Sequence, residues 1–322
     1  MSERQDLFTR LINAYSNRYL ELKIYNDLEK LFNASLKKPL AELKIPVPQN
    51  NGMSPVILLG MHRSGTTLLS KILRESGVYM GSLRGKDTDE SLFFQNVNKA
   101  IYKLSGATWD VPEPFKLSLE DELHRCILTK VLSEYCLIPQ KTKSYLSTTS
   151  FTKPTLFSIP QLWGWKDPRT CFSLPLWLKI FPRAKIIYIQ RNGVDVAQSL
   201  IVRNGKLKGK QSFSATKGDL LGAFKLWEMY NQECLIGINS LDPERVHTMR
   251  YEELLRTPEE ILSQVFNFLK LEKPLVNIND LIKNIDDQKA YAFTKSTELI
   301  DFYEGIKETE FMKQFGYDNI SI

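Results

Sequence analysis

Short apolar runs alternate along most of the chain with longer segments of helical periodicity. The runs are rich in branched and aromatic residues and are bounded by turn residues, which predicts β-strands. They are PVILLG (55–60), VYMG (78–81), LWGWK (162–166), AKIIYIQR (184–191) and RVHTMRY (245–251). Helical patterns follow or separate them, notably from Thr66, at 93–104 and at 121–136. Strands separated by helices favour parallel crossovers, so we expect an α/β fold with three layers and a mostly parallel central sheet.

The first part of the chain has a different pattern. Apolar residues recur every three or four positions from Leu7 to Leu36, which predicts an amphipathic helical arm in residues 1–45. The apolar stripe consists of Phe8, Ile12, Tyr15, Tyr19, Leu22, Tyr25, Leu28 and Phe32. Such a stripe packs on the body of its own chain or on a second copy, so a homodimer through the arm is one of two possibilities.

Prolines and an Asn-Gly pair interrupt both periods in residues 46–54, which predicts a linker. Residues 55–322 then form the α/β domain, with a helical C-terminal cap from about residue 272. Residues 212–223 and the tail beyond Leu271 have a helical or irregular pattern without a chemical signature. In open parallel sheets, ligands bind at the carboxyl ends of the strands, and functional residues are expected there.

Composition narrows the classes of protein. A net charge of +6 with 43% hydrophobic residues excludes a disordered chain and a disulfide miniprotein. The basic residues form no dense runs, so no nucleic-acid partner is expected. No apolar run approaches ~20 residues and the amino terminus lacks a secretion signal, so we expect a cytoplasmic protein without a membrane span. The four cysteines lack metal-ligand spacing, which indicates reduced thiols and no structural zinc.

Residues 60–67 match the pattern of a phosphate-binding loop except at one position. The loop follows an apolar strand and opens a helix, where unpaired backbone N–H groups and the helix dipole attract an anion. Gly65 permits the tight turn. Thr66 replaces the lysine that contacts the β- and γ-phosphates of a nucleoside triphosphate, which disfavours ATP or GTP chemistry. The positive charge lies instead at Arg63, inside the loop, where it can neutralise charge on a bridging oxygen.

The end of the predicted strand at 184–191 argues against a metal site. Thr67 has the hydroxyl that can hold Mg²⁺, but residues 184–191 end in Gln190-Arg191 rather than in the aspartate that completes such a site. We therefore expect no metal. A phosphosulfate suits the loop, because its terminal sulfuryl group carries less negative charge than a terminal phosphate.

Two motifs in order resemble those of a known family. MHRSGTTLL (61–69) resembles the 5′-phosphosulfate loop of the sulfotransferases that use 3′-phosphoadenosine 5′-phosphosulfate (PAPS), and IIYIQRNGVDVAQSL (186–200) resembles their 3′-phosphate motif. WGWKDPRTC (163–171) and MRYEELLRTPEEILSQVFNFL (249–269) are also similar to sulfotransferase segments. The resemblance runs roughly from Pro55 to Leu271. It implies the P-loop sulfotransferase fold of the bacterial type, PAPS as donor and adenosine 3′,5′-bisphosphate (PAP) as product.

The resemblance also implies the donor-binding residues. Arg191 and Ser199 would bind the 3′-phosphate, and Tyr251 would lie near the adenine. The loop residues that would hold the 5′ end are Arg63, Ser64, Gly65, Thr66, Thr67 and Leu68. The alternatives are a surface salt bridge for Arg191, a solvated helix hydroxyl for Ser199 and a core position for Tyr251.

A basic segment rich in Gly, Lys and Ser follows at 203–218. It is either a solvated loop or a closure over the 3′-phosphate by Arg203, Lys208 or Lys210.

Sulfuryl transfer to a hydroxyl or amine requires a base for the acceptor proton and positive charge on the leaving phosphate. Arg63 suits the second role. Lys166 resembles a family lysine beside the transferred group, although an ion pair with Asp167 is the alternative. Arg169 is a further candidate for this site.

The segment before Phe93-Phe94 supplies the candidate base. A carboxylate three residues before Phe-Phe is similar to the catalytic glutamate of glycan-modifying sulfotransferases, which selects Glu90 over Asp89. The family pattern has a basic residue where this chain has Asp89, and a solvated acidic loop is the alternative. If desolvated, the adjacent carboxylates would raise each other's pKa. His62 is another candidate base, whereas His124 and His247 have the pattern of a helix and a strand residue.

The acceptor is not determined by these motifs. A carbohydrate, a lipid-linked molecule or a small metabolite all fit. The aromatic residues that either line an acceptor subsite or belong to the core are Trp109, Trp163, Trp165 and Phe115. Two other functions stay open: a degenerate P-loop kinase or nucleotide hydrolase, and a nonenzymatic nucleotide-binding protein.

Overall fold

The computed structural model describes residues 3–46, 52–146, 155–206, 219–272, 274–283 and 285–322. Four parallel strands form its sheet. They are β1 (Val56–Leu59), β2 (Gly164–Lys166), β3 (Lys185–Gln190) and β4 (Val246–Arg250), in the order β2-β1-β3-β4. Every pairing is parallel, which confirms the expected α/β fold.

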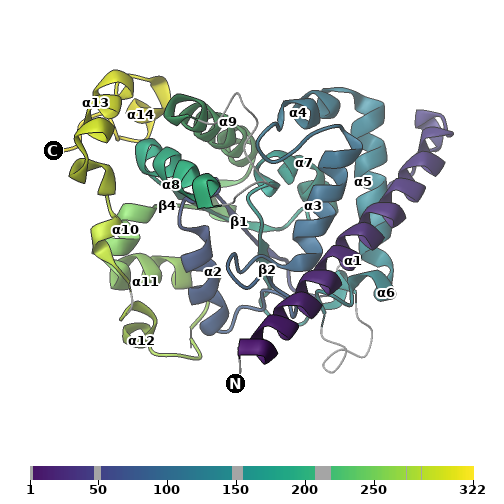
Figure 1. Ribbon diagram of the computed structural model, residues 1–322. Coiled ribbons are helices and arrows are strands. Elements are labelled where there is room, and N and C mark those ends of the chain that lie inside the picture. Colours follow the sequence, from purple (N-terminus) through teal and green to yellow (C-terminus); the bar gives the residue numbers. More distant parts are fainter. Residues whose placement is uncertain (1–2, 47–51, 147–154, 207–218, 273, 284) are drawn as a thin grey trace.

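Successive residues of the strands point to opposite faces of the sheet, and each face has its own core. Ile57 and Leu59 of β1 pack with the larger core, whereas Val56 and Leu58 pack with the smaller one. All four side chains are completely buried. Because both faces of the central strand are apolar, helices must cover both, and Figure 1 shows them on either side.

The larger core is built mainly from helices on one face. These are α3 (Leu92–Leu104), α5 (Glu122–Leu137), α7 (Thr170–Ile180), α8 (Gly193–Lys206), α9 (Leu220–Asn239), α13 (Thr297–Ile306) and α14 (Glu310–Gln314), with α4 (Glu113–Glu120) and α6 (Pro139–Thr142) beside them. The opposite face is covered by α2 (Thr66–Glu75), α10 (Tyr251–Arg256), α11 (Pro258–Leu269) and α12 (Ile278–Ile282). The sheet is therefore the middle of three layers.

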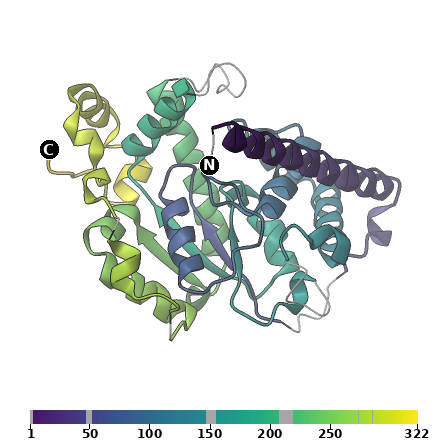
Figure 2. The ribbon, with the colours of Figure 1, turned by 60° about the horizontal axis from the view of Figure 1, so that its bottom comes forward.

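The amino-terminal arm is one long helix, α1 (Glu3–Leu36), that lies along α3 and α5 (Figures 1 and 2). Ile24, Leu28 and Phe32 are buried in the larger core, so the helix packs on the body of its own chain. The predicted stripe was wrong at Tyr19 and Leu22, which are 61% and 51% exposed. The buried face is set by the spacing of four from Ile24 onward. A homodimer through the arm stays a prediction, as do the domain bounds.

One predicted strand needs correction. The run at 78–81 is not a strand, because only Tyr79 forms a bridge, to Trp163. Positive φ angles at Gly77 (107°) and Gly81 (90°) turn the chain away on both sides of it. Residues 212–223 were expected to be helical or irregular; α9 begins at Leu220, and residues 207–218 lie outside the described part of the chain.

Candidate active site

The carboxyl ends of all four strands meet at one edge of the sheet and bring the predicted residues together. The loop with Arg63 follows β1, Lys166 ends β2, Arg191 follows β3 and Tyr251 follows β4. These residues are up to 188 positions apart, and the parallel topology alone places them side by side.

The loop between β1 and α2 has the backbone that an anion site requires. Arg63 and Gly65 have left-handed φ angles of 71° and 89°, and α2 begins at Thr66 without a side-chain cap among the described residues. Its first N–H groups are thus available to an anion, with the positive end of the helix dipole behind them. Gly65 also lies against the ring of Tyr251, since a Cβ built at Gly65 would be 2.1 Å from Cδ2 of Tyr251.

Changing Gly65 to alanine is therefore expected to damage both stability and donor binding. The left-handed backbone and the contact with Tyr251 both oppose a side chain, and we expect a fall in Tm of about 5 °C or more in a thermal unfolding experiment. Gly305→Ala is the matched control, because a Cβ there meets no atom within 4 Å and the residue lies inside α13. An equal Tm for the two variants would contradict the prediction.

A cavity of about 390 Å³ lies over this loop. It is lined by Arg63, Gly65, Thr66, Thr67, Leu68, Arg191, Ser199, Tyr251 and Lys289. Every donor-binding residue predicted from the sequence lines it except Ser64, which is buried in the loop. The structure thus places these residues around one space.

Two arginines and a serine are linked inside this cavity. Arg63 Nε donates a hydrogen bond of 2.8 Å to Ser199 Oγ, and Arg191 Nη1 donates one of 3.0 Å to the Arg63 carbonyl. The Arg191 guanidinium lies 4.6 Å from the centre of the Tyr251 ring. Burial, together with Arg203 and Arg191, lowers the pKa of Arg63 from its usual value. Positive charges held this close favour a doubly anionic ligand.

The carboxyl-terminal segment contributes contacts that the sequence pattern did not reveal. Arg191 Nη2 donates to the Lys289 carbonyl at 3.3 Å, and it lies 3.6 Å from Asp195 Oδ2. Asp195 in turn accepts hydrogen bonds from the N–H groups of Ala292 (3.2 Å) and Phe293 (2.8 Å). Burial raises the pKa of Asp195 although these partners oppose the shift. The carboxylate therefore ties the tail to the helix that carries the 3′-phosphate motif.

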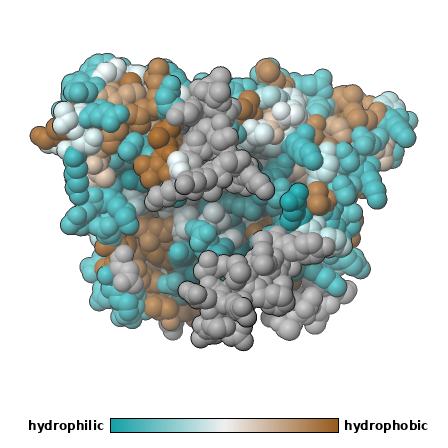
Figure 3. All heavy atoms as spheres, in the orientation of Figure 1, coloured by the Kyte–Doolittle hydropathy of each residue, from teal (hydrophilic) through white to brown (hydrophobic). Residues whose placement is uncertain are grey.

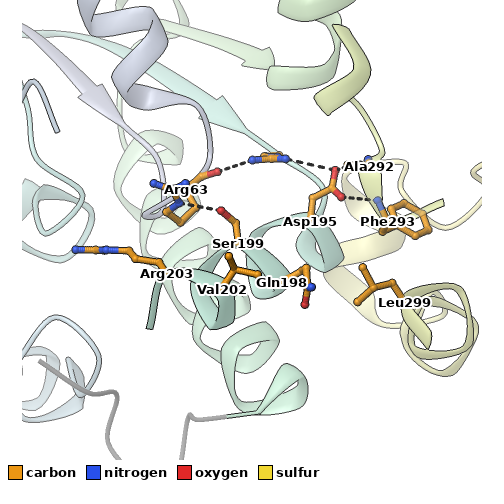
Figure 4. Close-up of a pocket in the computed structure, with 10 residues that line it drawn as sticks. Arg63, Asp195, Gln198, Ser199, Val202, Arg203, Ala292, Phe293 and Leu299 are labelled. Atoms are coloured by element: carbon orange, nitrogen blue, oxygen red, sulfur yellow. Dashed lines mark hydrogen bonds and ion pairs between the residues drawn. The ribbon is translucent and has the colours of Figure 1, made fainter. Parts of the chain in front are cut away.

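A second cavity of about 560 Å³ shares Arg63, Arg191 and Ser199 with the first. Figure 4 shows Asp195, Ser199, Val202 and Leu299 around it, with Arg203 directed away from Ser199. The predicted basic loop was wrong at residues 203–206, which form the end of α8. Of the three residues expected to close over the 3′-phosphate, Lys208 and Lys210 lie outside the described residues and Arg203 lies within them.

Lys166 connects the phosphate loop to the predicted base. Its Nζ lies 3.1 Å from Glu90 Oε1 and donates to the Thr88 carbonyl at 2.6 Å and to Thr67 Oγ1 at 3.3 Å. The alternative pairing with Asp167 was wrong, because Asp167 is bound instead by Arg169 Nη1 at 2.9 Å. The ammonium group of Lys166 thus stands between Thr67, which lines the cavity over the phosphate loop, and Glu90.

Glu90 and Asp89 point to different environments. Both are buried, but Asp89 has a φ of 52° and binds Ser70, Arg74 and Arg84. Burial alone would raise the pKa of Glu90, yet Lys166 and Arg169, with a hydrogen bond from Gln95, hold it below its usual value. The expectation that the two carboxylates raise each other's pKa was therefore wrong for Glu90.

A third cavity, of about 470 Å³, contains Glu90. His62, Trp109, Asp110, Arg169 and Arg203 are among the residues that line it. The His62 ring meets the Trp109 ring edge to face, with centroids 4.7 Å apart. Burial and the nearby arginines lower the pKa of His62 well below its usual value, so the imidazole is neutral at pH 7.

The other aromatic candidates belong to the core. Trp163, Trp165 and Phe115 are completely buried, so of these four described residues only Trp109 lines the cavity with Glu90. Figure 3 shows hydrophilic residues in the hollow at the middle of the face where Figure 1 places α2, α3 and α8.

Within the described ranges, no cluster of three or more His, Cys, Asp or Glu side chains could hold a metal ion. Among the same residues, no helix is both long and apolar enough to cross a bilayer.

The family model described as the sulfotransferase family matches residues 55–274, from the residue before β1 to a few residues beyond α11. The chain belongs to this family. The two motifs that resembled this family in the sequence, at 61–69 and 186–200, both lie within the matched residues. Its arm and its carboxyl-terminal tail lie outside the matched residues.

Three proteins are similar to different parts of this chain. An uncharacterized protein of Aquifex aeolicus is 27% identical over 67% of the chain and 25% of its own length. A putative protein-tyrosine sulfotransferase of Caenorhabditis briggsae is 29% identical over 33% of the chain and 36% of its own length. Omega-hydroxy-beta-dihydromenaquinone-9 sulfotransferase Stf3 of Mycobacterium bovis is 26% identical over 48% of the chain and 40% of its own length. The matches span less than half the length of each of these relatives.

Solved structures with a similar chain path include two sulfotransferase domains. The one from the curacin biosynthetic pathway is 19% identical, with a TM-score of 0.46 over 80% of this chain and 99% of that domain. The one from the Synechococcus PCC 7002 olefin synthase is 17% identical, with a TM-score of 0.47 over 83% of this chain and 99% of that domain.

Proposed function

We propose that this sulfotransferase transfers the sulfuryl group of PAPS to a hydroxyl or amine of an acceptor, without a metal. The observation that supports this most directly is the position of Lys166. Its Nζ contacts Thr67 of the phosphate loop and Glu90 of the neighbouring cavity, so one cation reaches both sides of the place where transfer would occur.

The donor would occupy the cavity over the phosphate loop. The loop amides and Arg63 would hold its 5′ end, and Arg191 with Ser199 would bind the 3′-phosphate. The hydrogen bond of 2.8 Å between Arg63 and Ser199 supports adjoining sites for the two phosphates, because these side chains are in contact. The Tyr251 ring, fixed between Gly65 and the Arg191 guanidinium, would flank the adenine.

In the reaction, the acceptor oxygen or nitrogen forms a bond to sulfur while the bond from sulfur to the bridging oxygen breaks. The electron pair of that bond stays on the 5′-phosphate of PAP, where Arg63 and Lys166 stabilise it. Glu90 accepts the acceptor proton. As Lys166 turns toward the negative charge that develops on the 5′-phosphate, its ion pair with Glu90 weakens. The pKa of Glu90 then rises, so the carboxylate becomes a stronger base at the moment of proton transfer.

Thermal unfolding with PAP tests the donor assignment. A ligand at ~100 times its Kd adds ~2.7 kcal/mol to stability, so PAP should raise Tm clearly. Stabilisation by ATP with Mg²⁺ but not by PAP would overturn the proposal in favour of a kinase or nucleotide hydrolase. Binding of PAP without sulfuryl transfer would favour a nonenzymatic protein.

Arg191→Met should remove the preference for the 3′-phosphate. We expect PAP affinity to fall roughly 10- to 100-fold, since one charge-assisted hydrogen-bonding group is lost. Adenosine 5′-monophosphate has no 3′-phosphate, so its affinity should change little, and calorimetric titration of both ligands measures the difference. Arg183→Met, at an exposed position, is the matched control. An equal loss for both nucleotides would assign Arg191 a structural role only.

The cytoplasmic location and the absence of a nucleic-acid partner stay predictions.

A further inference from the structure

The cavity around Glu90 is polar on almost every side. Apart from Trp109, each side chain that lines it carries a hydroxyl, an amide, an imidazole or a charge. Glu21 and Lys99 form an ion pair of 3.0 Å at this cavity, and Asp110 accepts a hydrogen bond of 2.7 Å from Thr108. An apolar acceptor would remove water from these groups without replacing its hydrogen bonds, which is costly. Hydroxyl groups both donate and accept, so they can satisfy charges of both signs.

Trp109 gives the same cavity one flat apolar surface. Its backbone carbonyl accepts a 2.6 Å hydrogen bond from the buried Tyr230 hydroxyl, which anchors the loop. The edge-to-face contact with His62 and the Arg203 guanidinium 5.8 Å from the ring centre fix the indole further. A rigid aromatic face in a polar pocket fits a molecule that is apolar on one face and rich in hydroxyls at its edges.

His62 adds a second hydrogen-bonding group beside the base. The side chain is more than nine-tenths buried, and its Nε2 has no hydrogen-bond partner among the described residues. A neutral imidazole offers one donor and one acceptor. His62 therefore suits a hydroxyl next to the one that Glu90 would deprotonate.

We infer that the acceptor is a polyhydroxylated ring, a sugar or a cyclic polyol, that stacks on Trp109 and hydrogen-bonds to Glu90 and His62. The inference rests on the proposed sulfuryl transfer and names its acceptor class. The arm takes part, because Glu21 of α1 lies at the cavity although α1 is outside the residues that match the family.

The test uses the full chain with radiolabelled PAPS and three acceptor classes. These are a panel of methyl hexopyranosides and disaccharides, a tyrosine-containing acidic peptide, and a long-chain primary alcohol in detergent. We expect labelled sulfate on one or more of the sugars. Transfer to the peptide or the alcohol alone, or to none of the sugars, overturns the inference. Stabilisation by PAP is measured in parallel, so failure of the donor assignment is distinguished from failure of the acceptor assignment.

Trp109→Ala should raise the KM for the sugar roughly tenfold while the Kd of PAP stays unchanged. Trp109→Phe keeps a flat ring and should recover most of the loss. Leu117→Ala, at a position 62% exposed on α4, is the control. A parallel loss of PAP binding and acceptor binding in Trp109→Ala, without recovery in Trp109→Phe, would contradict a stacking role.

Discussion

Replacing Glu90 with glutamine is expected to lower kcat by about 10²- to 10⁴-fold, which is the typical contribution of a well-placed general base. The Kd of PAP should stay within about twofold. Glutamine keeps the size of the side chain and a hydrogen bond to Lys166, but it cannot accept the acceptor proton. Single-turnover transfer from PAPS measures the chemical step, and calorimetric titration of PAP measures donor binding. The two readouts separate catalysis from folding.

Glu42→Gln is the matched control, because Glu42 is exposed in the short helix after α1. The pH profile gives a second check. The wild-type rate should fall at acidic pH as Glu90 becomes protonated, and Glu90→Gln should lose that acidic limb. Near-normal turnover of Glu90→Gln would remove Glu90 from the mechanism, and attention would move to His62.

Lys166→Met is expected to lower kcat about 10²- to 10³-fold, the effect of removing one preorganised charge from the leaving group. The change also leaves the buried Glu90 carboxylate without its nearest cation. Methionine preserves the apolar length of the side chain, so the lost charge dominates. Lys179→Met, at an exposed position on α7, is the control.

The same variant should move the acidic limb of the rate profile. Lys166 is the largest favourable influence that lowers the pKa of Glu90, so its removal raises that pKa and shifts the limb to higher pH. The stability of the protein should also depend on pH. Because the pKa of Glu90 is lower in the folded protein than in the unfolded chain, the ionised carboxylate stabilises the wild type at pH values above the unfolded pKa. This contribution is lost as the pH falls through the folded pKa. The Lys166→Met variant should lack this pH-dependent stabilisation. An acidic limb of the rate profile at the same pH as in the wild type would contradict the pairing of Lys166 with Glu90.

The fold was predictable where the pattern of the sequence is local. The apolar runs of β1 and β3 and the helix after the phosphate loop follow from periodicity. The run at 78–81 has the composition of a strand but bridges at Tyr79 only, because the glycines on both sides turn its backbone. The exposure of Tyr19 and Leu22 could not be predicted either. Apolar periodicity predicts a helix, but it does not give the rotation of that helix about its own axis when it packs on the domain.

The sequence by itself determined the two motifs on which the proposed donor site rests: a strand followed by a glycine turn with Thr66 in place of lysine, and a second motif with Arg191 and Ser199. These are local features, because each depends on residues a few positions apart. Only the tertiary structure decided that Lys166 pairs with Glu90 rather than Asp167, that Asp89 turns away, and that Lys289 reaches the cavity over the phosphate loop. Those contacts join residues 76 or more positions apart, or depend on one backbone angle, so no local pattern encodes them.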